Sequence, residues 1–304
     1  MLQVVNEFLQ ASGKEPFFNV QLVGLTKEVK LENSLFSVHT EKLLKDVKET
    51  DLIFIPSLSG DLKTAVELNK EVLPWLVDQY KNGAEVASIC VGSFLLASTG
   101  LLKGKKCSTH WGSANEFRTM FPDVELADGA IITDEHGLYS SGGANSYWNL
   151  LLYLIEKNID RNTAVIASKL FAVDIDRNSQ SVFMLFDGQK NHGDDAILDT
   201  QRFIEGNFQT KTTVDDLAEK AAIGKRSFER RFKKATNNTV VEYMQRVKIE
   251  AAKKHFENSR KNINEVMYDV GYNDKKTFRI IFKKITGLTP IEYQRKYNKQ
   301  TIIN

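Results

Sequence analysis

Cys90 lies in the sequence context that most favours covalent chemistry in this chain. It follows the apolar run 85–89 and precedes the helical pattern 93–101, with Gly92 two positions further on. A strand that turns tightly into a helix projects the side chain at the turn near a helix N-terminus, where the dipole favours a thiolate. His110 could act as its base. Free cysteines and lone histidines are also common structural residues, so the two residues are either a nucleophilic site or ordinary structural residues.

A second set of functional side chains is a repeated cluster of positive charge near the C-terminus. Segments 225–234 and 275–284 each combine a row of Lys and Arg with two Phe residues four positions apart. Residues four apart share a helix face, so each Phe pair would bury one face and turn the charges outward. Arg can recognise guanine and Lys can bind phosphate, which favours double-stranded DNA as the partner. The predicted DNA-binding residues are Lys225, Arg226, Ser227, Glu229, Arg230, Lys233, Lys275, Lys276, Thr277, Arg279 and Lys283.

Charge is divided unevenly along the 304 residues. Residues 1–194 hold 18 Lys and Arg against 25 Asp and Glu, whereas residues 195–304 hold 23 against 14. A basic module tethered to an acidic one indicates that only the C-terminal part meets a polyanion. Arg230 has a second interpretation as the partner of an internal salt bridge.

Composition excludes several other classes of protein. Two cysteines do not make a disulfide framework, no apolar run reaches the ~20 residues of a membrane span, and the N-terminus lacks an export signal. We therefore expect a cytoplasmic protein that does not contact a membrane. No cofactor and no metal site are expected.

The elements that must position Cys90 and His110 alternate between short apolar runs and amphipathic helices, which predicts an α/β domain over residues 1–188. The chain opens on a helical segment, 2–11, where such a domain more often begins with a strand. The predicted strands are 18–23, 51–55, 85–89, 106–110 and 137–140. The predicted helices are 65–81, 93–101, 113–121, 147–157 and 161–170.

Residues 187–195 are polar and contain glycine, and they indicate a linker or the end of the first domain. Beyond them, an all-α domain is predicted over 195–304. Capping-box patterns at Thr213–Asp216 and Asn262–Glu265 open the first helix of each basic unit. A long helix over 240–258 would separate the units, and each unit has the pattern of a helix-turn-helix motif.

The C-terminal part resembles the DNA-binding domain of the AraC/XylS transcription regulators over residues 214–297. The motifs that carry the resemblance are Leu217-Ala218, Ser227-Phe228-x-Arg230-x-Phe232-Lys233, Val270-Gly271-Tyr272-x-Asp274, Phe278, Phe282-Lys283 and Gly287-x-Thr289-Pro290. Three single positions and one turn depart from the family pattern, and in that turn Asn237-Asn238-Thr239-Val240 replaces a glycine-to-proline sequence. Gly224 replaces a Ser helix cap, Met267 replaces a small Ala, and Ile280 replaces an Arg. The second helix is therefore expected to contribute less to base recognition than the first.

The N-terminal part resembles the class I glutamine amidotransferase-like fold of the ThiJ/PfpI superfamily. Its motifs are Asp51–Pro56, Ser88-Ile-Cys90-Val-Gly92, Ser108-Thr-His110-Trp111 and Ser141-Gly142-Gly143-Ala144, and 177–180 resembles a supporting turn. The resemblance implies a domain built on a flavodoxin-like open parallel sheet. This domain would dimerise and bind a ligand near Cys90, Val91, His110 and Gly143. The first strand is lacking, either in the protein or because the start codon is assigned too far downstream. Ser88 replaces a Gly, and no third residue is available to orient His110.

These observations lead to two functions of different class. The first is a sequence-specific DNA-binding transcription regulator, an activator rather than a repressor, that forms homodimers through its N-terminal domain and senses a small molecule. In this hypothesis the protein is not an enzyme. The alternative is a cysteine-dependent amidase, peptidase or glyoxalase tethered to a basic module. A ligand-independent dimerisation scaffold is a third interpretation of the N-terminal domain.

Overall fold

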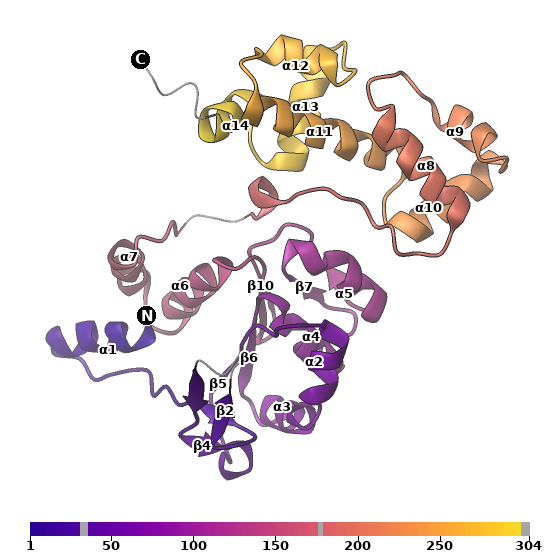
Figure 1. The fold of residues 1–304 in the computed structure, drawn as a ribbon. Coiled ribbons are helices and arrows are strands. Elements are labelled where there is room, and N and C mark those ends of the chain that lie inside the picture. The colour runs from indigo at the N-terminus through magenta and orange to yellow at the C-terminus, as the bar shows by residue number, and fades with distance from the viewer. Residues whose placement is uncertain (31–35, 176–178, 299–304) are drawn as a thin grey trace. The chain divides into compact units, whose positions relative to one another are not determined.

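The computed structural model describes residues 1–30, 36–175 and 179–298. The chain divides into two compact units, Met1–Gln180 and Ser181–Asn304. The first combines helices and strands and the second is helical (Figure 1).

A four-stranded sheet forms the centre of the first unit. Its strand order is β5-β6-β10-β9, with β5, β6 and β10 parallel and β9 antiparallel. The bounds of these strands are β5 Leu52–Ile55, β6 Glu85–Ile89, β9 Ile132–Glu135 and β10 Leu138–Ser141. The prediction of a flavodoxin-like open sheet is confirmed, and β5 and β9 are its edge strands within the described residues.

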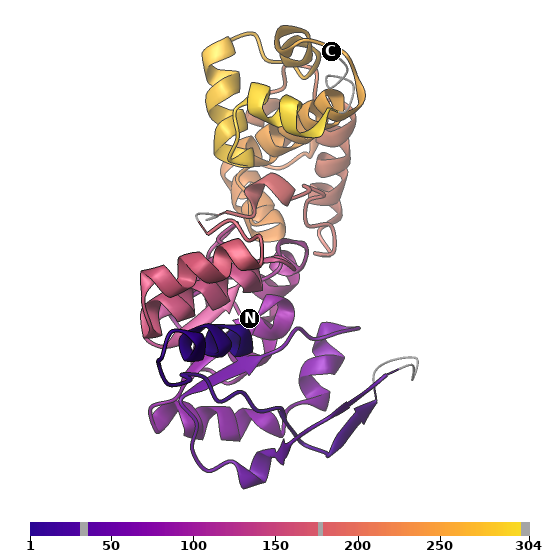
Figure 2. The same ribbon diagram turned by 90° about the vertical axis from the view of Figure 1, so that its left-hand side faces the viewer.

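Successive residues of each strand point to opposite faces of this sheet, so each face has its own apolar core. Val86 and Leu138 pack under one layer of helices, whereas the adjacent Ala87 and Tyr139 pack under the other. The first layer contains α2 Leu62–Leu68, α3 Val72–Lys81, α4 Ser93–Ser98 and α5 Ala114–Met120. The second contains α6 Ser146–Asn158, with α7 Arg161–Leu170 and α1 Leu2–Ala11 packed beyond it (Figure 2).

Shorter elements complete the first unit. The strand pair β2 and β3 is antiparallel, and the pairs β1–β4 and β7–β8 are parallel. Their bounds are β1 Val23–Gly24, β2 Glu28–Lys30, β3 Ser37–His39, β4 Lys42–Leu43, β7 Lys106–Cys107 and β8 Glu125–Leu126. Single turns of 3₁₀ helix are η1 Leu44–Asp46, η2 Cys90–Gly92 and η3 Trp111–Ser113.

Three expectations for this unit were wrong. Residues 18–22 are not a strand, and the N–H groups of Phe17 and Phe18 are bonded to the Asn6 carboxamide oxygen. The single helix predicted over 65–81 is two helices, and α2 ends at its C-cap Asn69. Strand β9 was missed because its side chains do not alternate. A two-residue turn, His136 and Gly137, both at positive φ, forms it by pairing it with β10.

Two apolar cores joined by one helix form the second unit. The first half of α11, Val240–Asn258, contributes Val240, Tyr243 and Val247 to one core. Its second half contributes Ile249, Ala252 and Phe256 to the other. The other helices are α8 Asp195–Gly206, α9 Val214–Lys220, α10 Lys225–Thr236, α12 Ile263–Asp269, α13 Lys275–Thr286 and α14 Pro290–Tyr297. Helix α11 lies between the two pairs α9–α10 and α12–α13 (Figure 1).

The segment that precedes α8, which includes the 3₁₀ turn η4 Ser181–Phe183, packs on the helical unit. The buried Lys253 ammonium donates to the Met184 carbonyl at 2.6 Å and pairs with Glu250 at 2.7 Å, and Glu250 accepts the Phe186 N–H at 3.2 Å. The Phe186 ring packs edge-on against Tyr243. These contacts place the division between the units at residue 180, whereas the composition predicted residue 188.

Candidate nucleic-acid interface and cysteine site

The orientation of α10 and α13 follows from two buried aromatic pairs. Phe228 and Phe232 are fully buried in the first core of the helical unit, and Phe278 and Phe282 in the second. In each pair the rings lie 5.7–5.8 Å apart, within the range for favourable aromatic contact. Residues on the opposite side of each helix therefore face solvent.

The two helix-turn-helix units repeat in three dimensions with an offset of 50 residues. Thr236 and Thr286, which end α10 and α13, each donate a side-chain hydrogen bond to the carbonyl four residues earlier. Asn237 and Gly287 then cap these helices in the left-handed conformation. Capping boxes at Thr239 and Thr289 begin the next helices. The predicted capping boxes at Thr213 and Asn262 are also present.

Each helix carries an outward stripe at positions i, i+4 and i+7. On α10 the stripe is Arg226, Arg230 and Lys233, and all three side chains are exposed. On α13 it is Lys276, Ile280 and Lys283, which are exposed as well. Within the described residues, none of the five cationic side chains in the stripes makes an ion pair, so their charges are available to a polyanion.

The other predicted DNA-binding residues also lie on these two helices. Glu229, Lys275, Thr277 and Arg279 are exposed, and Ser227 is half-buried. Lys225 pairs with Asp215 of α9 at 2.9 Å. A DNA phosphate would therefore have to compete with the Asp215 carboxylate for the Lys225 ammonium.

The internal salt bridge considered for Arg230 is formed by its neighbour. The Arg231 guanidinium donates to both carboxylate oxygens of Asp194 at 3.0 and 2.7 Å. These bonds hold the pKa of Asp194 below its ordinary value, because they favour the charged carboxylate. Arg231 therefore fixes α10 to the start of α8, and Arg230 is left to face outward.

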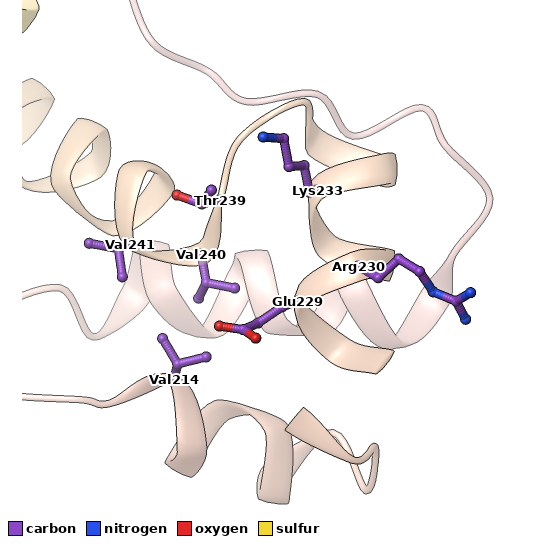
Figure 3. Close-up of a pocket in the computed structure, with 7 residues that line it drawn as sticks. All are labelled: Val214, Glu229, Arg230, Lys233, Thr239, Val240 and Val241. Carbon is purple, nitrogen blue, oxygen red and sulfur yellow. The ribbon is translucent and has the colours of Figure 1, made fainter. Parts of the chain in front are cut away.

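A groove of about 290 Å³ lies beside the α10 stripe (Figure 3). The Glu229 carboxylate points into it, toward Val214 and Val240, whereas Arg230 points away from α11. Glu229 therefore flanks the stripe at the edge of the groove.

The three single-residue departures from the family pattern have separate structural consequences. Gly224 provides no side-chain cap for α10, whereas Asp274 at the corresponding position accepts the Thr277 N–H at 2.7 Å. Met267 is buried in the second core. Ile280 is 57% exposed at the centre of the α13 stripe.

Cys90 occupies the predicted tight turn between β6 and α4. Its φ is +55°, a left-handed conformation that is costly for a residue other than glycine. At Gly92, an added Cβ would lie 2.4 Å from the Pro56 carbonyl oxygen, so this turn requires glycine. Ser93 donates to the Cys90 carbonyl and to the Thr109 hydroxyl, which brings the segment 109–110 next to the turn.

His110 is held in its neutral form beside this turn. Partial burial lowers the pKa of its imidazole, and Nδ1 accepts the Gly112 N–H at 3.1 Å. No hydrogen bond links the imidazole to the Cys90 thiol in the described part of the chain. Burial raises the pKa of the other cysteine, Cys107, to about 12, so that thiol is a core residue.

Gln180 is a residue that sequence reasoning did not place in this site. Its carboxamide oxygen accepts the Gly143 N–H at 2.7 Å, and its nitrogen donates to the carbonyls of Thr109 and Ala130 at 3.1 and 2.8 Å. The backbone amide of Gly143, a predicted ligand contact, is therefore used internally. Val91 packs against the core. The residues before Gln180 in the predicted supporting turn, Arg177 and Asn178, lie outside the described residues.

Among the described residues, no group of His, Cys, Asp and Glu could hold a metal ion. None of the helices in that part of the chain is long and apolar enough to cross a membrane.

The protein is of the class that joins an open α/β domain to two helix-turn-helix units on a shared helix. The α/β domain has a cysteine at the turn from strand to helix. Residues 217–296 match the helix-turn-helix domain family, and residues 8–157 match the DJ-1/PfpI family. The chain thus combines a DJ-1/PfpI domain with an AraC-type helix-turn-helix domain, and both resemblances noted in the sequence are confirmed.

Similar proteins match large parts of this chain at low identity. The transcriptional regulator GbdR of Pseudomonas aeruginosa (strain UCBPP-PA14) is 24% identical over 229 residues, which are 73% of this chain and 61% of GbdR. The regulator CdhR of P. aeruginosa (strain PAO1) is 22% identical over 86% of this chain and 76% of its own length. A crystal structure from Vibrio parahaemolyticus, 20% identical, covers 56% of this chain and 86% of that one with a TM-score of 0.50, which supports the fold. The chain spans about three fifths of the length of GbdR.

The Asp194–Arg231 pair predicts a pH-dependent stability. A carboxyl whose pKa is lower in the folded chain stabilises the fold above its unfolded value of about 3.9, and loses this effect as the pH falls through the folded value. We expect Asp194→Asn, which keeps a helix-capping side chain, to lower the free energy of unfolding at pH 7. The difference from the wild type should decline as the pH falls below about 4 and vanish once the pH is below the folded pKa of Asp194.

Urea unfolding followed by far-ultraviolet circular dichroism measures this difference, and the matched control is Asp195→Asn at the adjacent exposed position. All three Trp residues lie before residue 181, so their fluorescence reports the first unit separately. An Asp194→Asn effect of equal size at pH 3 and pH 7 would contradict the prediction.

Proposed function

We propose that this chain is a sequence-specific DNA-binding transcription regulator. The observation that carries the proposal is the pair of exposed stripes on α10 and α13, whose cationic members make no ion pair within the described residues. Arg226 and Arg230 can recognise guanine edges, and the Lys side chains can bind phosphates. The matches to an AraC-type domain and to proteins named as transcriptional regulators support the same conclusion.

The length of α11 supports simultaneous binding by both units. Its 19 residues make a helix of about 28 Å, which is near the ~34 Å of one turn of DNA. Because each end of α11 is packed in the core of one helix-turn-helix unit, the separation of α10 and α13 is set by a rigid element. The two helices would therefore enter successive segments of the major groove on one face of the duplex.

The N-terminal unit would control this activity by binding a small molecule near Cys90. Gln180, the last residue of this unit, is bonded to the Gly143 loop beside the cysteine turn and is followed directly by the segment leading to α8. A ligand that displaced its carboxamide would thus alter the start of that segment. Differential affinity for two arrangements would shift their populations, in the direction of activation in our proposal.

We expect Arg226→Ala together with Arg230→Ala to abolish the recovery of specific promoter fragments from genomic DNA by the full chain. The loss of base contacts should lower the affinity for a recovered site by roughly 10- to 100-fold at constant salt. Arg202→Ala is the matched control, because Arg202 is exposed on α8 and already pairs with Asp199. Fluorescence anisotropy with labelled duplexes measures the affinities. Equal binding by wild type and double variant would contradict the proposed interface.

Dimerisation is proposed for the first unit. Val29 and Val38 lie opposite each other in the β2–β3 hairpin, and both side chains are exposed, as is that of Phe36. Exposed apolar groups gathered on a hairpin suit a protein contact. Sedimentation velocity should give a dimer for the wild type and a monomer for Val29→Lys. A monomeric wild type at all concentrations would exclude this part of the proposal.

The enzyme alternative makes an opposite prediction for Cys90. If the turn serves as a ligand site, Cys90→Ala should leave the melting temperature and DNA binding of the protein without ligand nearly unchanged. It should remove the rise in melting temperature produced by the metabolite that stabilises the wild type, found by screening. Cys90→Ser is the matched control. Turnover of an amide or thioester substrate that disappears in Cys90→Ala would instead favour the enzyme.

A further inference from the structure

Helices α10 and α13, the recognition helices of the proposed interface, differ at the centre of their outward stripes. The 50-residue repeat places Ile280 of α13 at the position of Arg230 on α10, while the flanking positions are cationic on both helices. Arg226 corresponds to Lys276, and Lys233 to Lys283. The second stripe therefore holds one apolar side chain with a Lys about one turn away on either side.

Ile280 does not contribute to the core of its own unit. Its side chain is 57% exposed, whereas the adjacent Ile281 packs against the core that contains Phe278 and Phe282. A single exposed apolar residue is ordinary on a protein surface. Ile280 differs from such residues in its position. Lys276 and Lys283 would bind phosphates on the two sides of the major groove and so place Ile280 over the base edges.

We propose that Ile280 recognises the 5-methyl group of a thymine in the major groove segment that α13 enters. The inference rests on the proposed function and deepens it. Thymine alone among the four bases presents a methyl group there, and apolar side chains are suited to contact it. Arg at the same position on α10 is suited to guanine. The two DNA segments that one chain binds would therefore differ in sequence. Helix α10 would select guanine and helix α13 would select thymine.

The charge pattern of α13 explains why an apolar residue is tolerated at this position. Lys275, Lys276, Arg279 and Lys283 remain exposed on the same helix and supply the affinity for phosphate. Ile280 is thus free to contribute selectivity rather than charge. If Ile280 contacted another protein and not thymine, its replacement would leave the preferred base unchanged.

The test uses the full chain and duplexes selected from a random library. In the selected site each thymine is replaced in turn by deoxyuridine, which removes only the methyl group. We expect one replacement in one half-site to weaken binding about fourfold, the value for burying one methyl group, at fixed salt. Ile280→Ala should bind the thymine and deoxyuridine duplexes equally. Arg230→Ala, the matched control, should keep the fourfold difference.

A gain-of-function variant keeps the proposal testable if Ile280→Ala binds too weakly to measure. Selection with Ile280→Arg should replace the preferred thymine with guanine. Because Ile280 is exposed, thermal unfolding of both variants should match that of the wild type.

Three outcomes would overturn the proposal: a selected site without thymine in one half, no sensitivity of the wild type to deoxyuridine, or a sensitivity that survives Ile280→Ala. In each of these outcomes the protein still binds a specific DNA, so the proposed function stands. Failure to select any DNA would overturn the proposed function itself.

Discussion

The burial of two aromatic rings on each recognition helix is the constraint on which the rest of the DNA-binding unit depends. Truncation of one buried Phe costs about 3–5 kcal/mol, far more than any single charge on the surface contributes. The rotation of α10 is therefore set by Phe228 and Phe232, and the rotation of α13 by Phe278 and Phe282. The charged residues occupy the outward face because the aromatic residues occupy the inward one.

A second constraint is that one helix serves both cores. The two halves of α11 belong to different apolar clusters, and Phe208 packs against both. Neither helix-turn-helix unit can rotate freely without breaking the packing of α11. A rigid spacer of this kind fits recognition of two groove segments at fixed separation better than recognition by two independent modules. The cost of ordering the modules is met during folding rather than during binding.

The turn at Cys90 in the N-terminal unit combines a strained backbone with neighbouring polar groups that are already hydrogen-bonded within the unit. Cys90 is held at positive φ, and Gly92 is required by the closeness of the Pro56 carbonyl. The neutral His110 is bonded to a backbone amide, and Gln180 occupies the adjacent Gly143 loop. The same fold can support a catalytic site or a binding site, and the difference lies in these local contacts rather than in the sheet.

Local pattern by itself determined most of the helical unit. Capping boxes at Thr213 and Asn262, the paired Phe residues and the periodic spacing of α11 are short-range signals, and helices form from short-range interactions. The sequence also determined the charge of the stripes and the turn at Cys90. Tertiary structure decided what no periodic pattern indicates: strand β9 forms because the turn at His136 and Gly137 pairs it with β10, and residues 18–22 of the predicted strand 18–23 do not form a strand. It also decided that Arg231, rather than Arg230, pairs with Asp194, and that the Gln180 carboxamide accepts the Gly143 N–H. These outcomes depend on which side chains lie together after folding, and spacing along the chain does not specify contacts across 37 residues.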